Sequence, residues 1–159
     1  LSKEELEKNT VDLNLNQNIK MDSNVLNLTE FRWNPFESTI YGMYHGTVYI
    51  DSDYYLIGTD DQGNKICYQE TGRNGQETMF RQTIGLYPGY EEISPEANTI
   101  TLQLYEVKND TAHQVSEEKM DKDPSDDIYE ESTTYVYDGG ESPIDSAIPI
   151  GDNLTIQIR

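Results

Sequence analysis

The sequence of 159 residues contains one cysteine, Cys67. One thiol cannot form an intrachain disulfide, so the fold must depend on its core. Small extracellular eukaryotic domains usually carry an even set of cysteines, whereas bacterial cytosolic proteins and Gram-positive envelope proteins both tolerate a near absence. The cysteine count therefore leaves both bacterial compartments open. We interpret Cys67 as a small apolar residue of a strand, because no histidine lies near it in the sequence.

Basic residues are also scarce, with 11 Lys and Arg against 30 Asp and Glu and a net charge of −19. Such an excess of negative charge repels both the phosphates of nucleic acids and anionic lipid headgroups. The composition therefore argues against a nucleic-acid partner and against adsorption to an anionic membrane.

Long apolar runs are missing as well. No stretch approaches the roughly 20 apolar residues of a membrane helix, and no secretory hydrophobic region is present. Because the first residue is Leu1 and not methionine, we expect the parent protein to have an upstream segment.

The usual catalytic groups are few. The chain has only two histidines, no Gly-x-Ser-x-Gly motif, and no clustered ligand spacing for zinc. Carboxylates are so numerous that no particular pair stands out as an acid–base couple. We therefore expect a protein that is not an enzyme and that has no cofactor.

What the chain does contain is a set of strand signals. In the segment 25–46, β-branched and aromatic residues lie on both sides of Pro35, which lacks an amide hydrogen and has a fixed φ. This pattern predicts a strand, a corner and a second strand, with Trp33 or Phe36 as a core anchor. The run Asp60–Asn64 predicts a hairpin turn in which Gly63 has a positive φ.

Further strands are predicted along the chain. Alternating residues predict strands over 11–15 and 99–107, and a longer strand is expected over 77–87. About eight to ten short strands without an interior helix indicate an all-β protein, which we expect to be an immunoglobulin-like antiparallel β-sandwich. Residues 1–10 read as a linker or frayed turn, and residues 11–159 as a single sandwich domain.

Residues 109–131 form an acidic excursion with few apolar anchors. Long segments of this kind in compact domains tend to be functional or disordered. Hard oxygen ligands concentrate at four aspartates, a weak calcium candidate that lacks the EF-hand pattern: Asp121, Asp123, Asp126 and Asp127. We expect a solvated acidic loop and no formed metal site.

Tyrosine is abundant, with 12 residues, and several gather in one third of the chain. Their amphipathic rings suit sugars and protein partners, but they also serve as ordinary packing within a sheet. Both interpretations stay open for the candidate binding residues, which are Tyr41, Tyr44, Tyr49, Tyr54 and Tyr55.

Four short segments carry a family resemblance: Pro35–Tyr41, Asp60–Asn64, Phe80–Thr83 and Ile148–Gly151. On these residues the chain resembles the β-rich ectodomains of uncharacterised, mainly Firmicute membrane proteins. In that family a cytoplasmic part similar to an anti-sigma factor precedes a transmembrane helix and one or two such ectodomains. The resemblance implies no catalytic residues.

Two functional hypotheses follow. The first is a non-enzymatic, extracellular sensor or interaction domain of a membrane-anchored, anti-sigma-factor-like regulator on the outer face of a Gram-positive cell membrane. The second is a carbohydrate-binding or adhesin module of a secreted protein that uses the tyrosine-rich region. The expected partner is an envelope protein or a glycan.

Overall fold

The structure is a computed structural model that describes residues 2–46, 52–108, 112–116, 133–137 and 142–159. These residues form an all-β fold with one short α-helix and one 3₁₀ helix. The elements are α1 (Lys3–Lys8), β1 (Val11–Lys20), β2 (Asn24–Asn34), β3 (Glu37–Gly46), β4 (Ser52–Asp60), β5 (Lys65–Asn74), β6 (Glu77–Gln82), β7 (Thr99–Lys108), β8 (Ala112–Ser116), β9 (Thr133–Tyr137), η2 (Pro143–Ser146) and β10 (Ile148–Gln157).

The predicted corner and hairpin turn are both confirmed. Strand β2 ends at Asn34 and β3 begins at Glu37, so the corner falls at Pro35. The Asn34 side-chain oxygen accepts a hydrogen bond from the backbone N–H of Phe36 at 2.8 Å, which closes the turn. The turn between β4 and β5 contains Gly63 with φ of +89°.

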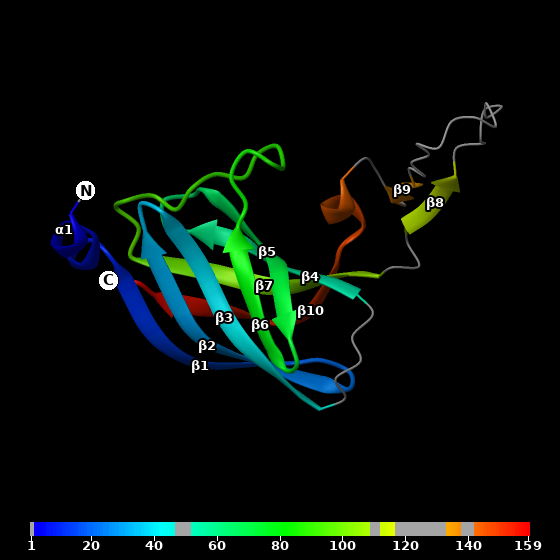
Figure 1. The fold of residues 1–159 in the computed structure, drawn as a ribbon, viewed down its shortest axis with the longest axis horizontal. Coiled ribbons are helices and arrows are strands. Elements are labelled where there is room, and N and C mark those ends of the chain that lie inside the picture. The colour runs from blue at the N-terminus through cyan, green and yellow to red at the C-terminus, as the bar shows by residue number, and fades with distance from the viewer. Residues whose placement is uncertain (1, 47–51, 109–111, 117–132, 138–141) are drawn as a thin grey trace, which may run out of the picture.

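Eight strands form one antiparallel sheet in the order β1-β2-β3-β6-β5-β4-β7-β10. The predicted immunoglobulin-like sandwich of two sheets is therefore corrected to a single, barrel-like sheet. The reason is a long-range pairing. Strand β3 pairs with β6 and β4 pairs with β7, so the two groups of strands join edge to edge and do not stack face to face. Strand twist and β-bulges then curl the sheet on itself (Figure 1).

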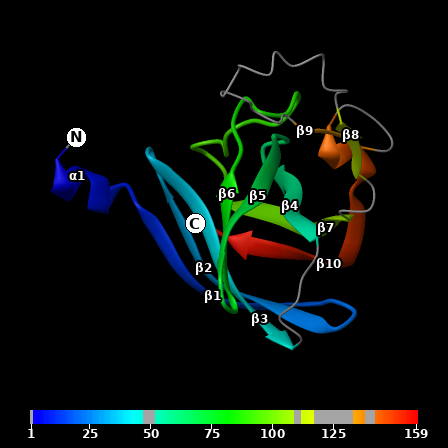
Figure 2. The same ribbon diagram turned by 45° about the vertical axis from the view of Figure 1, so that its right-hand side comes forward.

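The edge strands β1 and β10 meet without pairing. A Cβ atom on Gly151 would lie 3.1 Å from Ile19 Cγ2 and 3.5 Å from the carbonyl oxygen of Lys20. The end of β1 therefore lies against the bulge of β10, yet no backbone ladder joins these two described strands. Figure 2 shows α1 projecting away from the curled sheet. Its Ser2–Glu5 capping box is formed, and it buries no residue.

The concave face of the sheet holds the main core. The largest fully buried side chains are Leu26, Leu28, Phe31, Ile40, Tyr44, Leu56, Ile66, Tyr68, Phe80, Ile100, Leu102 and Leu104. In the first half of edge strand β1, the inward residues Val11, Leu13 and Leu15 pack against this core but are only partly buried. Ile19, near the end of β1, is buried at 3% exposure. Burial along β1 therefore increases toward the end that lies against β10.

A second apolar cluster lies on the outer face, around Tyr55, Cys67 and Val107. Residues from the 83–98 segment and from η2 cover it, including Tyr87 and Tyr90. The predicted strand over 77–87 therefore ends early, at Gln82, and the chain turns across the sheet. The interpretation of Cys67 as a small apolar strand residue is confirmed, since it is fully buried in β5.

The two aromatic residues of the corner differ in environment. Trp33 is partly buried and packs against the main core, whereas Phe36 is 75% exposed. Only the expectation for Trp33 is therefore supported. Elsewhere, β8 and β9 form a separate two-stranded sheet. Within the described ranges, no helix has the length and apolar character needed to cross a membrane.

Candidate functional site

The structure does not form the predicted exposed row of tyrosines. Tyr44, Tyr54 and Tyr55 are 2%, 4% and 2% exposed, so their rings are packing residues. Tyr41 is partly buried, and its hydroxyl donates a hydrogen bond to Glu37 at 3.3 Å. Tyr49 lies outside the described residues. Three of the five candidate tyrosines therefore lie inside the protein and not side by side on an exposed face.

Two of these tyrosines belong to a buried polar network. Glu70 accepts hydrogen bonds from the hydroxyls of Tyr44 and Thr78, the latter at 2.6 Å, and from Arg73 Nε at 2.8 Å. The Arg73 guanidinium carbon lies 5.6 Å from the ring centroids of both Tyr44 and Tyr54. The Glu70 side chain is 6% exposed and that of Arg73 is 29% exposed, so the enclosed carboxylate has a charged partner at the surface.

This network keeps the tyrosine hydroxyls protonated. Burial, together with the charge of Glu70 and the hydrogen bond to it, raises the pKa of Tyr44. Burial and the charge of Glu106 likewise raise the pKa of Tyr54, whose hydroxyl lies 3.1 Å from Glu106 Oε2. Both groups therefore act as hydrogen-bond donors that hold the strands together.

The calcium candidates Asp121, Asp123, Asp126 and Asp127 lie outside the described residues. Within the described part of the chain, no group of three or more His, Cys, Asp or Glu side chains is placed to hold a metal ion.

A cavity of about 370 Å³ opens at the β2–β3 corner, at the other end of the sheet from the Glu70 network. Its size lies within the range of small-ligand sites. Its lining comes from the β2–β3 corner, the ends of β1 and β6, the 83–98 segment and the C-terminal residue of the sequence. The lining residues are Asn9, Val11, Trp33, Asn34, Pro35, Gln82, Glu92, Ile93, Pro95 and Arg159.

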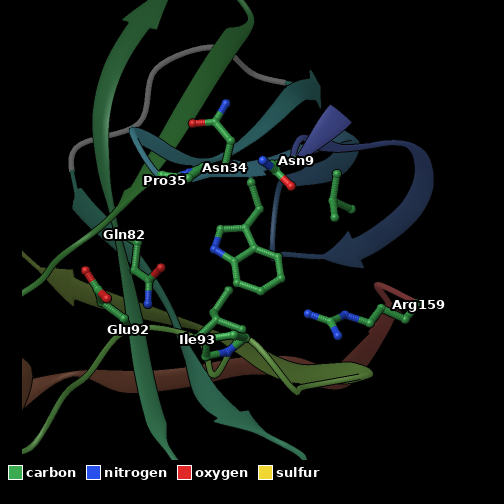
Figure 3. A pocket seen from close by; sticks show the side chains of 10 residues that line it. Asn9, Asn34, Pro35, Gln82, Glu92, Ile93 and Arg159 are labelled. Carbon is green, nitrogen blue, oxygen red and sulfur yellow. The ribbon is translucent and has the colours of Figure 1, made fainter. Parts of the chain in front are cut away.

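The lining of the cavity combines an apolar surface with polar groups on two sides of it. Trp33, Ile93 and the prolines supply apolar surface. Figure 3 shows Gln82 and Glu92 on one side of the cavity and Arg159 on the other, with Ile93 between them. Among the described residues of the lining, the charged side chains are Glu92 and Arg159, and their formal charges cancel.

Hydrogen bonds within the protein fix which polar atoms remain available. The Asn34 oxygen is used by the backbone of Phe36, so its amide NH₂ is left as a donor. Gln82 Nε2 donates to the carbonyl oxygen of Glu91 at 3.0 Å, which leaves Oε1 as an acceptor. The indole N–H of Trp33 has no partner among the described residues and is not sealed from solvent. Both donors and acceptors therefore remain available around the apolar surface.

One buried carboxylate holds the loop that forms a wall of the cavity. Asp60, which is 4% exposed, accepts hydrogen bonds at 2.9 Å from the backbone N–H groups of Ser94, Gln62 and Asn64. Burial acts to raise the pKa of Asp60, but these hydrogen bonds outweigh it and lower the pKa below its ordinary value. Because Ser94 lies between Ile93 and Pro95, the ionised carboxylate fixes the loop at the cavity.

A second hollow of about 370 Å³ adjoins the cavity and shares Gln82 with it. It adds Glu37, Arg81 and the exposed ring of Phe36. We call the two hollows together the Trp33 groove. It presents one aromatic side chain in each half, separated by Pro35.

No protein-family model, curated protein or solved structure matches the chain. The Trp33 groove was not predicted from the sequence. Its members are far apart along the chain, and the only local signal was the single Trp33 next to a proline corner.

Proposed function

We propose that the chain is a non-enzymatic sensor or interaction domain, displayed on the outer face of a Gram-positive cell membrane by an anti-sigma-factor-like regulator. The resemblance of its short segments to such ectodomains supports the membrane-anchored setting, and the net charge of −19 suits a surface that does not adsorb to anionic lipid. The observation that carries the binding role is the Trp33 groove, whose polar groups have unused hydrogen-bonding capacity.

The geometry suits binding better than a structural role for these residues. Unused donors and acceptors around an apolar floor cost nothing in water, yet they become favourable when a complementary ligand replaces the solvent. The strands that carry the groove are well supported, because β2, β3 and β6 each have a paired neighbour on both sides. A ligand would therefore meet a largely preformed surface.

The setting is tested by labelling cells of the source organism with an antibody raised against this chain. The expected result is labelling of intact cells and recovery of the antigen with the membrane fraction. Labelling that requires permeabilisation would contradict an outward-facing domain. Recovery of all the antigen from the culture medium would instead support the second hypothesis, a secreted carbohydrate-binding or adhesin module.

The signalling role is tested in the complete parent protein with a reporter driven by the dependent sigma factor. Glu92→Gln should change reporter output because it removes a charge from the groove. Glu96→Gln is the matched control, since Glu96 is an exposed residue of the same loop and is not part of the groove. Equal output from the parent and both variants would contradict a signalling role for the groove.

A further inference from the structure

We propose that the Trp33 groove binds a short, neutral, linear saccharide of two or three pyranose units. This inference rests on the proposed binding function and names its ligand class. Three features of the groove lead to it: the pattern of its polar atoms, its charge, and its two aromatic side chains.

The polar pattern matches hydroxyl groups, each of which both donates and accepts. The available donors are the indole N–H of Trp33, the Asn34 amide and the Arg159 guanidinium. The available acceptors are Gln82 Oε1 and the Glu92 carboxylate. The planar carboxylate and guanidinium groups can each engage two neighbouring hydroxyls of one ring.

The charges of the groove and of the whole chain favour a neutral ligand. Glu92 and Arg159 cancel within the cavity, while the whole chain carries a net charge of −19. The second half of the groove adds Glu37 and Arg81, whose formal charges also cancel. A polyanionic ligand would be repelled by the field of the whole chain and would meet a carboxylate beside each guanidinium of the groove. A neutral saccharide meets neither penalty.

The aromatic side chains account for the length of the ligand. Trp33 lies in the first half of the groove and Phe36 in the second. Pyranoses with equatorial substituents have apolar C–H faces that can pack against aromatic rings. The hydroxyl groups around the edge of the sugar ring then stay free for hydrogen bonds. The exposure of Phe36, at 75%, leaves its ring open to such a contact.

A peptide is the less favoured ligand. Extended peptides usually gain affinity by pairing with a free strand edge. Trp33, Phe36 and Gln82 lie on or beside β2, β3 and β6, and all three strands are already paired on both sides. Edge strand β1 contributes one lining residue, Val11, at its first position. The groove instead offers side-chain groups, which suits hydroxyl recognition.

The single tryptophan provides a direct measurement. In a ¹H–¹⁵N correlation spectrum of the isotope-labelled chain, the one indole resonance reports on Trp33. Cellobiose, cellotriose, chitobiose and chitotriose would be titrated to about 20 mM, an excess over the millimolar affinities of weak ligands. We expect at least one series to shift the indole resonance in a saturable way, with the trisaccharide binding more tightly.

Three variants locate the contacts. Asn34→Asp keeps the acceptor for the backbone of Phe36 but removes the amide donor, and it should weaken binding about tenfold, as should Glu92→Gln. Glu96→Gln is the matched control and should bind like the parent. Phe36→Ala should weaken the trisaccharide severalfold and leave the disaccharide unchanged, because Phe36 lies in the second half of the groove.

Failure of the saccharide inference can be distinguished from failure of the proposed function. Trialanine that shifts the indole resonance where the saccharides do not would overturn the saccharide class while leaving the binding function in place. Saccharide binding that Asn34→Asp, Glu92→Gln and Phe36→Ala leave unchanged would show that the ligand lies elsewhere. No saturable shift with any probe would overturn this inference, whereas the cell-labelling and reporter experiments decide the proposed function separately.

Discussion

Replacing Asp60 by asparagine tests how the wall of the Trp33 groove is held. In the parent, Oδ2 of Asp60 accepts from the Ser94 backbone at 2.9 Å and from Asn64 Nδ2 at 3.0 Å. Asparagine can keep the acceptor at Oδ1, but it places an NH₂ group opposite these two donors. The Asn64 side chain can turn to solvent, whereas the Ser94 N–H loses its acceptor at a partly buried position.

The expected loss follows from these contacts. An unsatisfied buried N–H costs about 1–3 kcal/mol, and the loss of the negative charge weakens the two remaining bonds. We therefore expect Asp60→Asn to lower the free energy of unfolding by about 2–4 kcal/mol, or roughly 5–15 °C in Tm for a chain of this size. Asp61→Asn is the control. Asp61 is exposed and, among the described residues, its side chain accepts from the backbone of Asn98, at 3.0 and 3.2 Å. The loss of stability in Asp61→Asn should therefore stay below about 1 kcal/mol.

Urea and thermal unfolding, followed by Trp33 emission, measure both variants at several pH values. The pKa of Asp60 is lowered in the folded state, so its contribution is present above the ordinary value of 3.8 and is lost as pH falls through the folded value. The gap between the parent and Asp60→Asn should therefore be constant near neutral pH and shrink below about pH 4. A neutral-pH Tm for Asp60→Asn equal to that of Asp61→Asn would refute the role assigned to the carboxylate.

Two further outcomes are expected from other parts of the fold. Gly58→Ala places a Cβ 1.7 Å from the carbonyl oxygen of Thr101, so thermal melting should show a loss of about 3 kcal/mol or more. Gly72→Ala, whose nearest contact is 3.8 Å away, should melt within a few degrees of the parent; equal losses would contradict the close approach of β4 and β7. Burial raises the pKa of the Cys67 thiol to about 11, so its reaction with a disulfide reagent at pH 8 should be at least about 100-fold slower in the folded chain than in urea. Equal rates would mean that Cys67 is not enclosed.

Local sequence patterns predicted the strands well but not their partners. Alternation identified the strand over 99–107, and the turn chemistry of Pro35 and Gly63 identified two connections. The pairing of β3 with β6 joins residues about 40 positions apart, and it depends on which edges remain free after the local hairpins form. This pairing, which no local pattern encodes, separates one curled sheet from the predicted sandwich.

The tyrosines also show which features local patterns can predict and which depend on distant parts of the chain. Tyr44 lies four positions after Ile40 in β3, and Tyr54 lies two positions before Leu56 in β4, so each points to the same face of the sheet as a core residue. Alternation within the strands could therefore have placed both tyrosines on the core face. Tyr55 points the other way and is buried only because the 83–98 segment and η2 cross the outer face. Its burial therefore depends on distant chain segments, as does the assembly of the Trp33 groove.

The unpaired meeting of β1 and β10 has a consequence for how the molecule opens. Each of these strands is held by one ladder, whereas the strands between them are held by two. Separating β1 from β10 breaks side-chain packing near Gly151 but no backbone ladder. Parting of these two edge strands therefore costs less than separating any paired strands of the sheet. Amide protons of β1 and β10 should exchange with solvent through local openings, whereas those of β4 and β5 should exchange only through global unfolding.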